Sequence, residues 1–393
     1  MRERKKIAAI ITEYRVPAHA DVIVGKFIKG FPTDDGLMAP QVDIVSMYLD
    51  QIPANDIGLK VSEKYHIPVY QSISQALCLG GDELAVDGVI SIGEHGDYAT
   101  NEKGQHLYPR RFFFEQISGV MASSGRSVPV FSDKHLSYNW SDAKWMYDRA
   151  QALEIPFMAG SSVPLMWRDP WLEHELDAPL EEAVLLGYGG IESYGYHSFE
   201  ALQAMVERRR GGERGIAAVQ CLEGDAVWQA AADGLWSREL AEAAAATGER
   251  PAGRMEDLCR EPAVFLLEYR DGFKAAVVQL NGFTSAWAYA GRVGAAIEAT
   301  TLYAFGPPHP HFSYLSLNIQ AMFLSGQPQY PVERTLLVSG ALDALMESRY
   351  QGHVRLETPH LEVAYRAPEK MPIRPLGARP SGASLVPFDA ADF

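Results

Sequence analysis

The first 160 residues repeat one pattern, in which a short apolar segment is followed by a turn and a segment of helical character. The apolar segments are residues 7–11, 42–50, 68–71, 87–93, 128–133 and 156–160. Strands that are apolar on both faces and alternate with helices are typical of a parallel sheet covered on each side. We therefore predict a Rossmann-like α/β domain over residues 1–160.

The pattern changes at about residue 161, where longer strands with alternating polarity begin. They occupy residues 181–190, 215–224, 263–272, 273–282 and 285–294, with helices expected at 198–210, 313–325 and 333–350. The pair Asp271-Gly272 suits a tight hairpin turn. A block of antiparallel strands with helices to one side predicts an α+β domain over residues 161–367. Residues 368–393 are rich in proline, glycine and serine and are expected to form an extended tail.

Charge and composition exclude several classes of partner. The net charge is −15, which argues against non-specific nucleic-acid binding because phosphate neutralisation needs a basic surface. No apolar run approaches a membrane span, and the basic N-terminus lacks the apolar core of a secretory signal. Cys78, Cys221 and Cys259 match no zinc or redox spacing, as expected for a reducing compartment. We expect a cytoplasmic protein.

The turn after the first strand is unusual for a nucleotide-binding unit. Such a turn is normally glycine-rich, so that the backbone can approach a pyrophosphate at the start of the next helix. Here residues 12–17 read TEYRVP and contain no glycine, and Pro17 lacks an N–H donor. We expect Glu13, Tyr14 and Arg15 to form a polar wall that contacts substrate, metal or a neighbouring loop.

Several segments make the chain similar to the Gfo/Idh/MocA family of glucose–fructose oxidoreductase and inositol dehydrogenase type. They are VSMYLD, FSDKHLSYNW, IESYGYHSFEAL and the stretch FSYLSLNIQAMFLSGQPQYPVERTLL. The resemblance covers most of the chain, from Lys5 to about Val363. It implies a Rossmann domain, a C-terminal open sheet that carries a sugar site, a carbohydrate ligand and a homo-oligomer, either a dimer or a tetramer.

The resemblance also implies roles for individual residues. Asp50 falls where an acidic residue takes the adenosine ribose, and Lys134 falls on the lysine that binds substrate and assists proton transfer. His197 falls on the catalytic histidine, with Glu200 and Ser193 in place of the usual acids. Asp133 and His135 stand in for the family's usual glutamate and proline around Lys134.

The chain departs from this family at both edges of the dinucleotide cleft. The first turn has lost its glycines, and the family's short turn after the fourth strand is replaced by the longer segment 93–109. That segment carries Glu94, His95, Asp97 and Tyr98. An NAD(P) site is therefore expected to be altered or lost.

Two kinds of chemistry suit these residues. In the first, Lys134 and His197 perform acid–base catalysis on a carbohydrate or cyclic polyol, by elimination, epimerisation or hydration of an oxidised sugar. The expected substrate-binding residues are Glu13, Tyr14, Arg15, His19, Tyr98, His135, Tyr194 and Glu200.

In the second, a divalent metal polarises a keto sugar. Glu94, His95 and Asp97, together with His135 or His197, offer carboxylate and imidazole ligands for Mn²⁺, Zn²⁺ or Fe²⁺. His309 and His311 form a further histidine pair that equally suits a loop packed against the tail. Two alternatives stay open at this level: an NAD(P)-dependent sugar dehydrogenase that holds its cofactor through Asp50, and a sugar-binding protein without catalysis.

Overall fold

The first domain is built on a six-stranded sheet whose paired neighbours are all parallel. The computed structural model describes residues 4–376, and its first sheet has the order β5-β4-β1-β6-β7-β8. Its strands are β1 (Lys5–Ile11), β4 (Val42–Leu49), β5 (Val69–Tyr70), β6 (Gly88–Ile92), β7 (Val130–Asp133) and β8 (Phe157–Gly160). Its helices are α1 (His19–Lys29), α2 (Gly58–Tyr65), α3 (Ile73–Cys78), α4 (Arg110–Ser123) and α5 (Trp140–Ala152). The predicted Rossmann-like sheet is confirmed.

Alternate residues of β1 enter different cores, which explains why this strand is apolar throughout. Ala8 and Ile10 pack with α3, α4 and α5 on one face. Ile7, Ala9 and Ile11 pack with α1 on the other. A strand covered on both faces has no polar side to show in its sequence.

The second domain is an eight-stranded sheet in the order β16-β11-β12-β13-β10-β14-β15-β9. Only β10 and β13 pair in parallel, so the sheet is mixed and mostly antiparallel, as predicted. Its strands are β9 (Trp167–Asp169), β10 (Leu180–Gly187), β11 (Ile216–Glu223), β12 (Ala263–Tyr269), β13 (Lys274–Gln279), β14 (Trp287–Val293), β15 (Ala296–Tyr303) and β16 (Leu356–Glu357). Gly272 has a φ of +85° between β12 and β13, which confirms the expected hairpin.

Several elements escaped the sequence prediction. The small hairpin of β2 (Phe31–Thr33) and β3 (Gly36–Met38) follows α1. The single strand expected at 285–294 is followed by a second strand, β15, which pairs with it. The helices of the second part of the chain are η1 (Val163–Leu165), α6 (Ser193–Val206), α7 (Asp225–Ala232), α8 (Arg238–Ala245), α9 (Met255–Leu258), α10 (His311–Ser325) and α11 (Val332–Tyr350). Within residues 4–376 no helix has both the length and the apolarity to cross a membrane.

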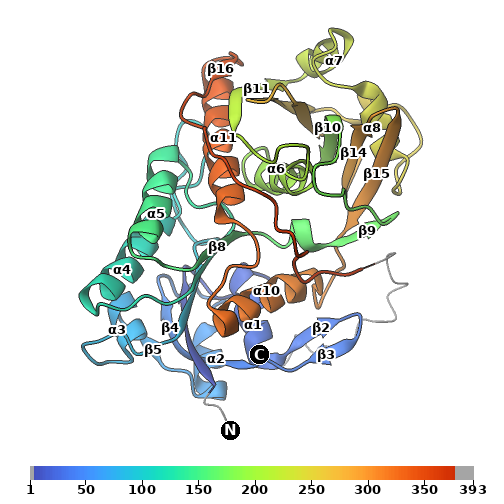
Figure 1. Cartoon of the computed structure of the whole chain (residues 1–393). Helices are drawn as coiled ribbons and strands as arrows, with labels where there is room; N and C mark the ends of the chain where they lie inside the picture. The colour runs from blue at the N-terminus through green and yellow to red at the C-terminus, as the bar shows by residue number, and fades with distance from the viewer. Residues whose placement is uncertain (1–3, 377–393) are drawn as a thin grey trace.

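The last helices join the two domains. Although α10 comes after the second sheet in sequence, it packs on α1 and β2 of the first domain. Leu315, Ile319 and Met322 of α10 share a core with Ile7 and Ile11 of β1. Helix α11 runs between α5 and α6, so it contacts both domains (Figure 1). The expected tail of residues 368–393 is described only as far as residue 376, and the rest lies outside the described residues.

Candidate active site

A cavity of about 440 Å³ lies where the carboxyl edge of the first sheet meets the second domain. His19 and His95 come from the first domain, and Tyr194, His197 and Trp287 come from the second. The segment 304–312, which ends in the first two residues of α10, contributes further wall, including two more histidines. Ligands of open α/β sheets bind at this edge.

His19 is oriented by a buried carboxylate. It is the first residue of α1, and its Nδ1 lies 2.6 Å from Oδ2 of Asp133 at the end of β7. Asp133 is fully buried. Because an ionised carboxylate only accepts hydrogen bonds, Nδ1 carries a proton, and Nε2 is the ring nitrogen that can take or give a second one. This pairing fixes the tautomer of His19, as a carboxylate does for the base of a catalytic triad.

His197 is a neutral histidine in the opposite wall. It lies on α6 and is only 9% exposed, and its Nδ1 has no hydrogen-bond partner among the described residues. Burial, and then the charge of Lys134, hold the pKa of His197 well below its usual value. The rings of Tyr194 and Trp287 meet it edge-on at 5.8 and 6.1 Å between centroids. Its imidazole is therefore neutral at pH 7, which is the form that can accept a proton, and its lowered pKa makes it a weaker base than a free imidazole.

A buried charge network lies behind these histidines. Oε1 of Glu94 accepts from Nζ of Lys134 at 2.8 Å, and Oε2 accepts from Arg110 at 2.5 Å. Arg110 also donates to Nε2 of His135 at 2.9 Å, so His135 is neutral and turned toward the network. Burial alone raises the pKa of Glu94, but the charges of Lys134 and Arg110 hold it well below its usual range.

The end of β4 is covered by the segment that follows β6. Tyr48 donates to Oδ1 of Asp50 at 2.8 Å, and Tyr98 donates to Oδ2 at 2.6 Å. The side chain of Gln51 makes two hydrogen bonds with the backbone of Asp97, at 2.8 and 3.1 Å. Both oxygens of the Asp50 carboxylate therefore already accept hydrogen bonds from tyrosine hydroxyls.

No protein-family model and no curated protein matches the sequence. Solved structures resemble it over nearly their whole length. GenD2 from gentamicin A biosynthesis, in complex with NAD, is 14% identical with a TM-score of 0.57 and covers 91% of this chain and 97% of its own. Scyllo-inositol dehydrogenase from Lactobacillus casei is 10% identical with a TM-score of 0.56, covering 91% and 99%. Aldose–aldose oxidoreductase from Caulobacter crescentus, complexed with glycerol, is 13% identical with a TM-score of 0.52, covering 91% and 100%.

The chain has the Gfo/Idh/MocA fold. The fold expected from the sequence is thus confirmed, while identities of 10–14% carry no specific reaction. Within that fold, residues at the dinucleotide edge already make hydrogen bonds inside the chain. The Asp50 oxygens are occupied by tyrosines, and the first turn is self-contained, because Arg15 bonds Glu13 at 2.5 Å and the carbonyl of Pro17 at 2.8 Å.

The structure gathers some predicted site residues of this Gfo/Idh/MocA-fold chain and separates others. His19, His95, Tyr194 and His197 line the cavity, and Lys134 and Glu94 form the network behind it. Glu200 is buried and is not among the lining residues, and its carboxylate accepts from the backbone N–H and the hydroxyl of Ser161 at 3.0 and 2.5 Å. His135 and Tyr98 are held by Arg110 and Asp50, as described above.

The prediction for Tyr14 is wrong. Its side chain is fully buried in the first domain, packed near Gly25 of α1 and Gly58 of α2, and does not reach the cleft. The aromatic ring fills core volume beside two residues that lack side chains. A tyrosine next to charged residues in a turn gives no sign of this, since burial depends on partners far along the chain.

The predicted group of metal ligands does not come together either. Among residues 4–376, no three histidine, cysteine, aspartate or glutamate side chains form a group that could hold a metal ion. The Glu94 carboxylate is bound by Lys134 and Arg110, and His95 faces His19 with ring centroids 5.3 Å apart. Burial and the nearby His19 lower the pKa of His95 to about 4.

The sequence gives little sign of two contributors to the site. Asp133 is expected only as a substitute for the family's glutamate, and no motif marks Trp287. His311 was left between two roles; it lines the cavity, is 5% exposed, and its Nδ1 meets no partner in the described part of the chain. The segment HPHF is the sequence signal for His311 and Phe312, since it gathers histidines and an aromatic residue at one place.

Proposed function

We propose that this chain is an enzyme that moves protons on a small cyclic polyol or oxidised sugar without a nicotinamide. One observation carries the proposal: a carboxylate-oriented histidine, His19, and a neutral buried histidine, His197, line one cavity from two domains. The closure of the Asp50 carboxylate by Tyr48 and Tyr98 supports the absence of a bound dinucleotide.

Two histidines in one cavity suit paired proton transfer. Neutral His197 takes a proton from a carbon next to a carbonyl, and the electron pair of the C–H bond moves onto the carbonyl oxygen as an enolate. In an elimination, the enolate expels a β-hydroxyl, and protonated His19 gives that group its proton so that it leaves as water. In an epimerisation, His19 instead returns a proton to the carbon from the other side. Asp133 stabilises the charged form of His19 in either case.

Lys134 acts on this chemistry through its charge. Its Nζ is bound to Glu94, and its positive charge lowers the pKa of His197, which keeps that histidine neutral at pH 7. The same charge favours a developing enolate in the cavity. The proposed role of Lys134 is therefore electrostatic.

The walls suit a single-ring ligand. A cavity of about 440 Å³ falls in the size range of small-molecule sites. Tyr194 and Trp287 are stacked with an angle of 13° between their planes, and they present aromatic surface next to His197. The cyclic polyol class is proposed on this basis and on the fold shared with inositol dehydrogenase structures.

The test uses proton exchange, which needs no cofactor. Keto-inositols and aldonolactones are incubated with the protein in D₂O, and deuterium incorporation next to the carbonyl is followed by ¹H NMR. We expect exchange by the natural protein and a loss of about 10²–10⁴-fold in His197→Asn and in His19→Asn. His66→Asn, at an exposed position outside the cavity, is the matched control.

Titration with NAD⁺, NADH, NADP⁺ and NADPH separates this proposal from the alternative of an NAD(P)-dependent sugar dehydrogenase. The alternative is favoured by GenD2, whose structure contains NAD. Micromolar binding of any of the four, together with turnover only in its presence, would establish the dehydrogenase instead. A protein that binds a sugar and never exchanges a proton would be the non-catalytic alternative.

A further inference from the structure

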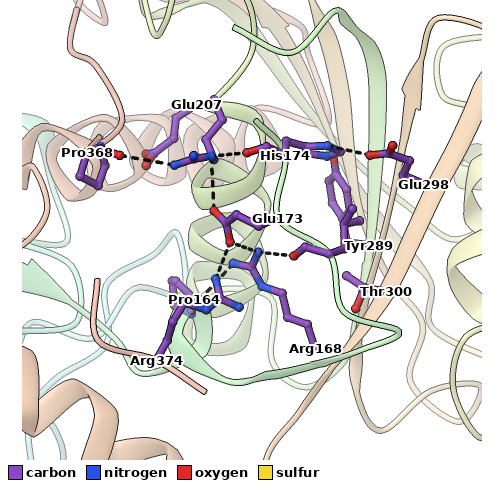
Figure 2. Close-up of polar contacts among 12 residues, drawn as sticks. Pro164, Arg168, Glu173, His174, Glu207, Tyr289, Glu298, Thr300, Pro368 and Arg374 are labelled. Carbon is purple, nitrogen blue, oxygen red and sulfur yellow. Dashed lines mark hydrogen bonds and ion pairs between the residues drawn. The ribbon is translucent and has the colours of Figure 1, made fainter. Parts of the chain in front are cut away.

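Three arginines converge on a single glutamate at a second place, where the end of the described chain crosses the domain interface. Arg168 donates to Oε2 of Glu173 at 2.6 Å, and Arg374 donates to the same oxygen at 2.7 Å (Figure 2). Arg208 lies 3.4 Å from Oε1 and donates to the carbonyl of His174 at 2.5 Å. We call Arg168, Arg208, Arg374 and Glu173 the arginine cluster.

The charges of this cluster do not balance. Three guanidinium groups face one carboxylate, and the side chains of Arg168 and Arg374 are only 2% and 3% exposed. The adjacent pair of Arg334 and Glu207 is already neutral, because its two groups bond each other through two hydrogen bonds of 2.7 and 2.5 Å. The cluster therefore holds two positive charges that no carboxylate of the described residues offsets.

Hydrogen-bond donors of the same arginines are also unmatched. Nε and Nη2 of Arg374 and Nε of Arg168 are buried, and they meet no acceptor within residues 4–376. Both arginines line a cavity of about 20 Å³. Its other charged lining residues are Arg208, Arg334, Glu173 and Glu207, so four arginines and two glutamates surround it. Such a volume holds one water molecule or one monatomic ion, and it excludes a sugar or a phosphate.

A bound anion would both accept from the unmatched N–H groups and offset the positive charge, whereas a water molecule would only accept. A water oxygen can accept from the unmatched N–H groups, but it leaves the two positive charges in a poorly solvated place at a large cost. Burial, and then the nearby Arg168, push the pKa of Arg374 well below its usual value. A guanidinium keeps its proton in proteins, so a nearby negative charge would stabilise Arg374.

We propose that the arginine cluster is a binding site for chloride or a monatomic anion of similar size. The anion accepts from Arg374 and Arg168 and fastens residues 368–374 to the domain interface. That segment is already tied to α10, because the side chain of Asn318 bonds the backbone N–H and carbonyl of Ile373 at 2.9 and 2.7 Å. The site is independent of the cavity chemistry proposed above.

The first test is thermal unfolding of the full chain at constant ionic strength, with sodium gluconate replaced stepwise by sodium chloride. A ligand that binds only the folded state raises Tm in a saturable way. We expect a rise of about 3 °C that saturates with chloride. In Arg374→Gln less than a third of the rise should remain. Arg355→Gln, at an arginine 43% exposed and outside the cluster, should keep all of it.

Glu173→Gln should strengthen the effect of chloride, whereas Arg374→Gln weakens it. Removal of the carboxylate of the arginine cluster leaves its three guanidinium groups without that counter-charge, so the Tm of this variant should depend on chloride more strongly than that of the natural chain. An unchanged chloride dependence in both Arg374→Gln and Glu173→Gln would overturn the proposal.

Bromide gives a direct test that does not depend on any variant folding. Crystals of the natural chain grown in sodium bromide should show an anomalous peak beside Arg374 and Arg168. A carboxylate or a water in that position, without bromide, would refute the anion site.

Discussion

Replacement of Glu94 by glutamine isolates the charge that balances the network behind the cavity. The substitution keeps the shape of the side chain and removes its negative charge. It leaves Lys134 and Arg110, whose side chains are 5% and 1% exposed, without the carboxylate that each contacts at 2.8 and 2.5 Å. Loss of one partner from a buried ion pair costs about 3–5 kcal/mol, because the remaining charge stays desolvated.

A matched control lies on the surface. Glu268 accepts two hydrogen bonds from Arg355, at 2.7 and 2.8 Å, but both side chains are more than 40% exposed. An exposed pair of this kind is worth about 0.2–1 kcal/mol. Urea unfolding at pH 7 should therefore show Glu94→Gln to be less stable than Glu268→Gln by at least about 2 kcal/mol.

The pH dependence supplies a second measurement of the same charge. Since the pKa of Glu94 is lowered on folding, its stabilising contribution is present above the ordinary value of 4.5 and is lost as pH falls through the folded-state pKa. The difference between the natural chain and Glu94→Gln should shrink in acid. Equal losses in Glu94→Gln and Glu268→Gln at pH 7 would refute the argument from burial.

Three further predictions concern the rest of the molecule. Gly215→Ala should lower the free energy of unfolding by at least about 3 kcal/mol, because the new Cβ would lie 2.0 Å from a backbone carbonyl oxygen. Gly272 also has a positive φ but has open space around it, so Gly272→Ala should cost only about 1 kcal/mol. Burial lowers the pKa of Lys26 from 10.5 to about 7, so between these pH values the unfolded chain binds a proton that the folded chain lacks. The free energy of unfolding should therefore rise with pH across that range, and it should rise less in Lys26→Met. Urea titrations at pH 7, 8.5 and 10 measure this. Ser348→Ala should lose about 1–3 kcal/mol by the same assay, because the buried N–H of Cys221 loses the hydroxyl oxygen that accepts from it at 3.0 Å, and a loss near zero would show that another acceptor takes its place.

The sequence allowed the two sheets to be predicted because their signals are local. Strands such as 7–11 are apolar on every residue, and the pattern states directly that both faces are covered. The hairpin at Asp271-Gly272 is equally local, since a tight turn requires a positive φ at a fixed place.

The site depended on partners that no local pattern contains. His19 and Asp133 are 114 positions apart, and Asp50 and Tyr98 are 48 apart. Each residue was noticed from its own segment, and the pairing that gives it a role came only from the packing of neighbouring strand ends. The prediction for Tyr14 was wrong for the same reason. Its neighbours in sequence are polar, but its side chain is buried in the core by residues far along the chain.

The position of helix α10 has a consequence for synthesis on the ribosome. The core of the first domain includes Leu315, Ile319 and Met322, which are made about 150 residues after the last strand of its sheet. Domains normally fold as units as they emerge. Here the first domain stays incomplete, with apolar surface uncovered on α1, until most of the second domain has been translated. We therefore expect that the nascent chain needs protection by chaperones over that interval, and that a fragment ending near residue 160 aggregates when expressed alone.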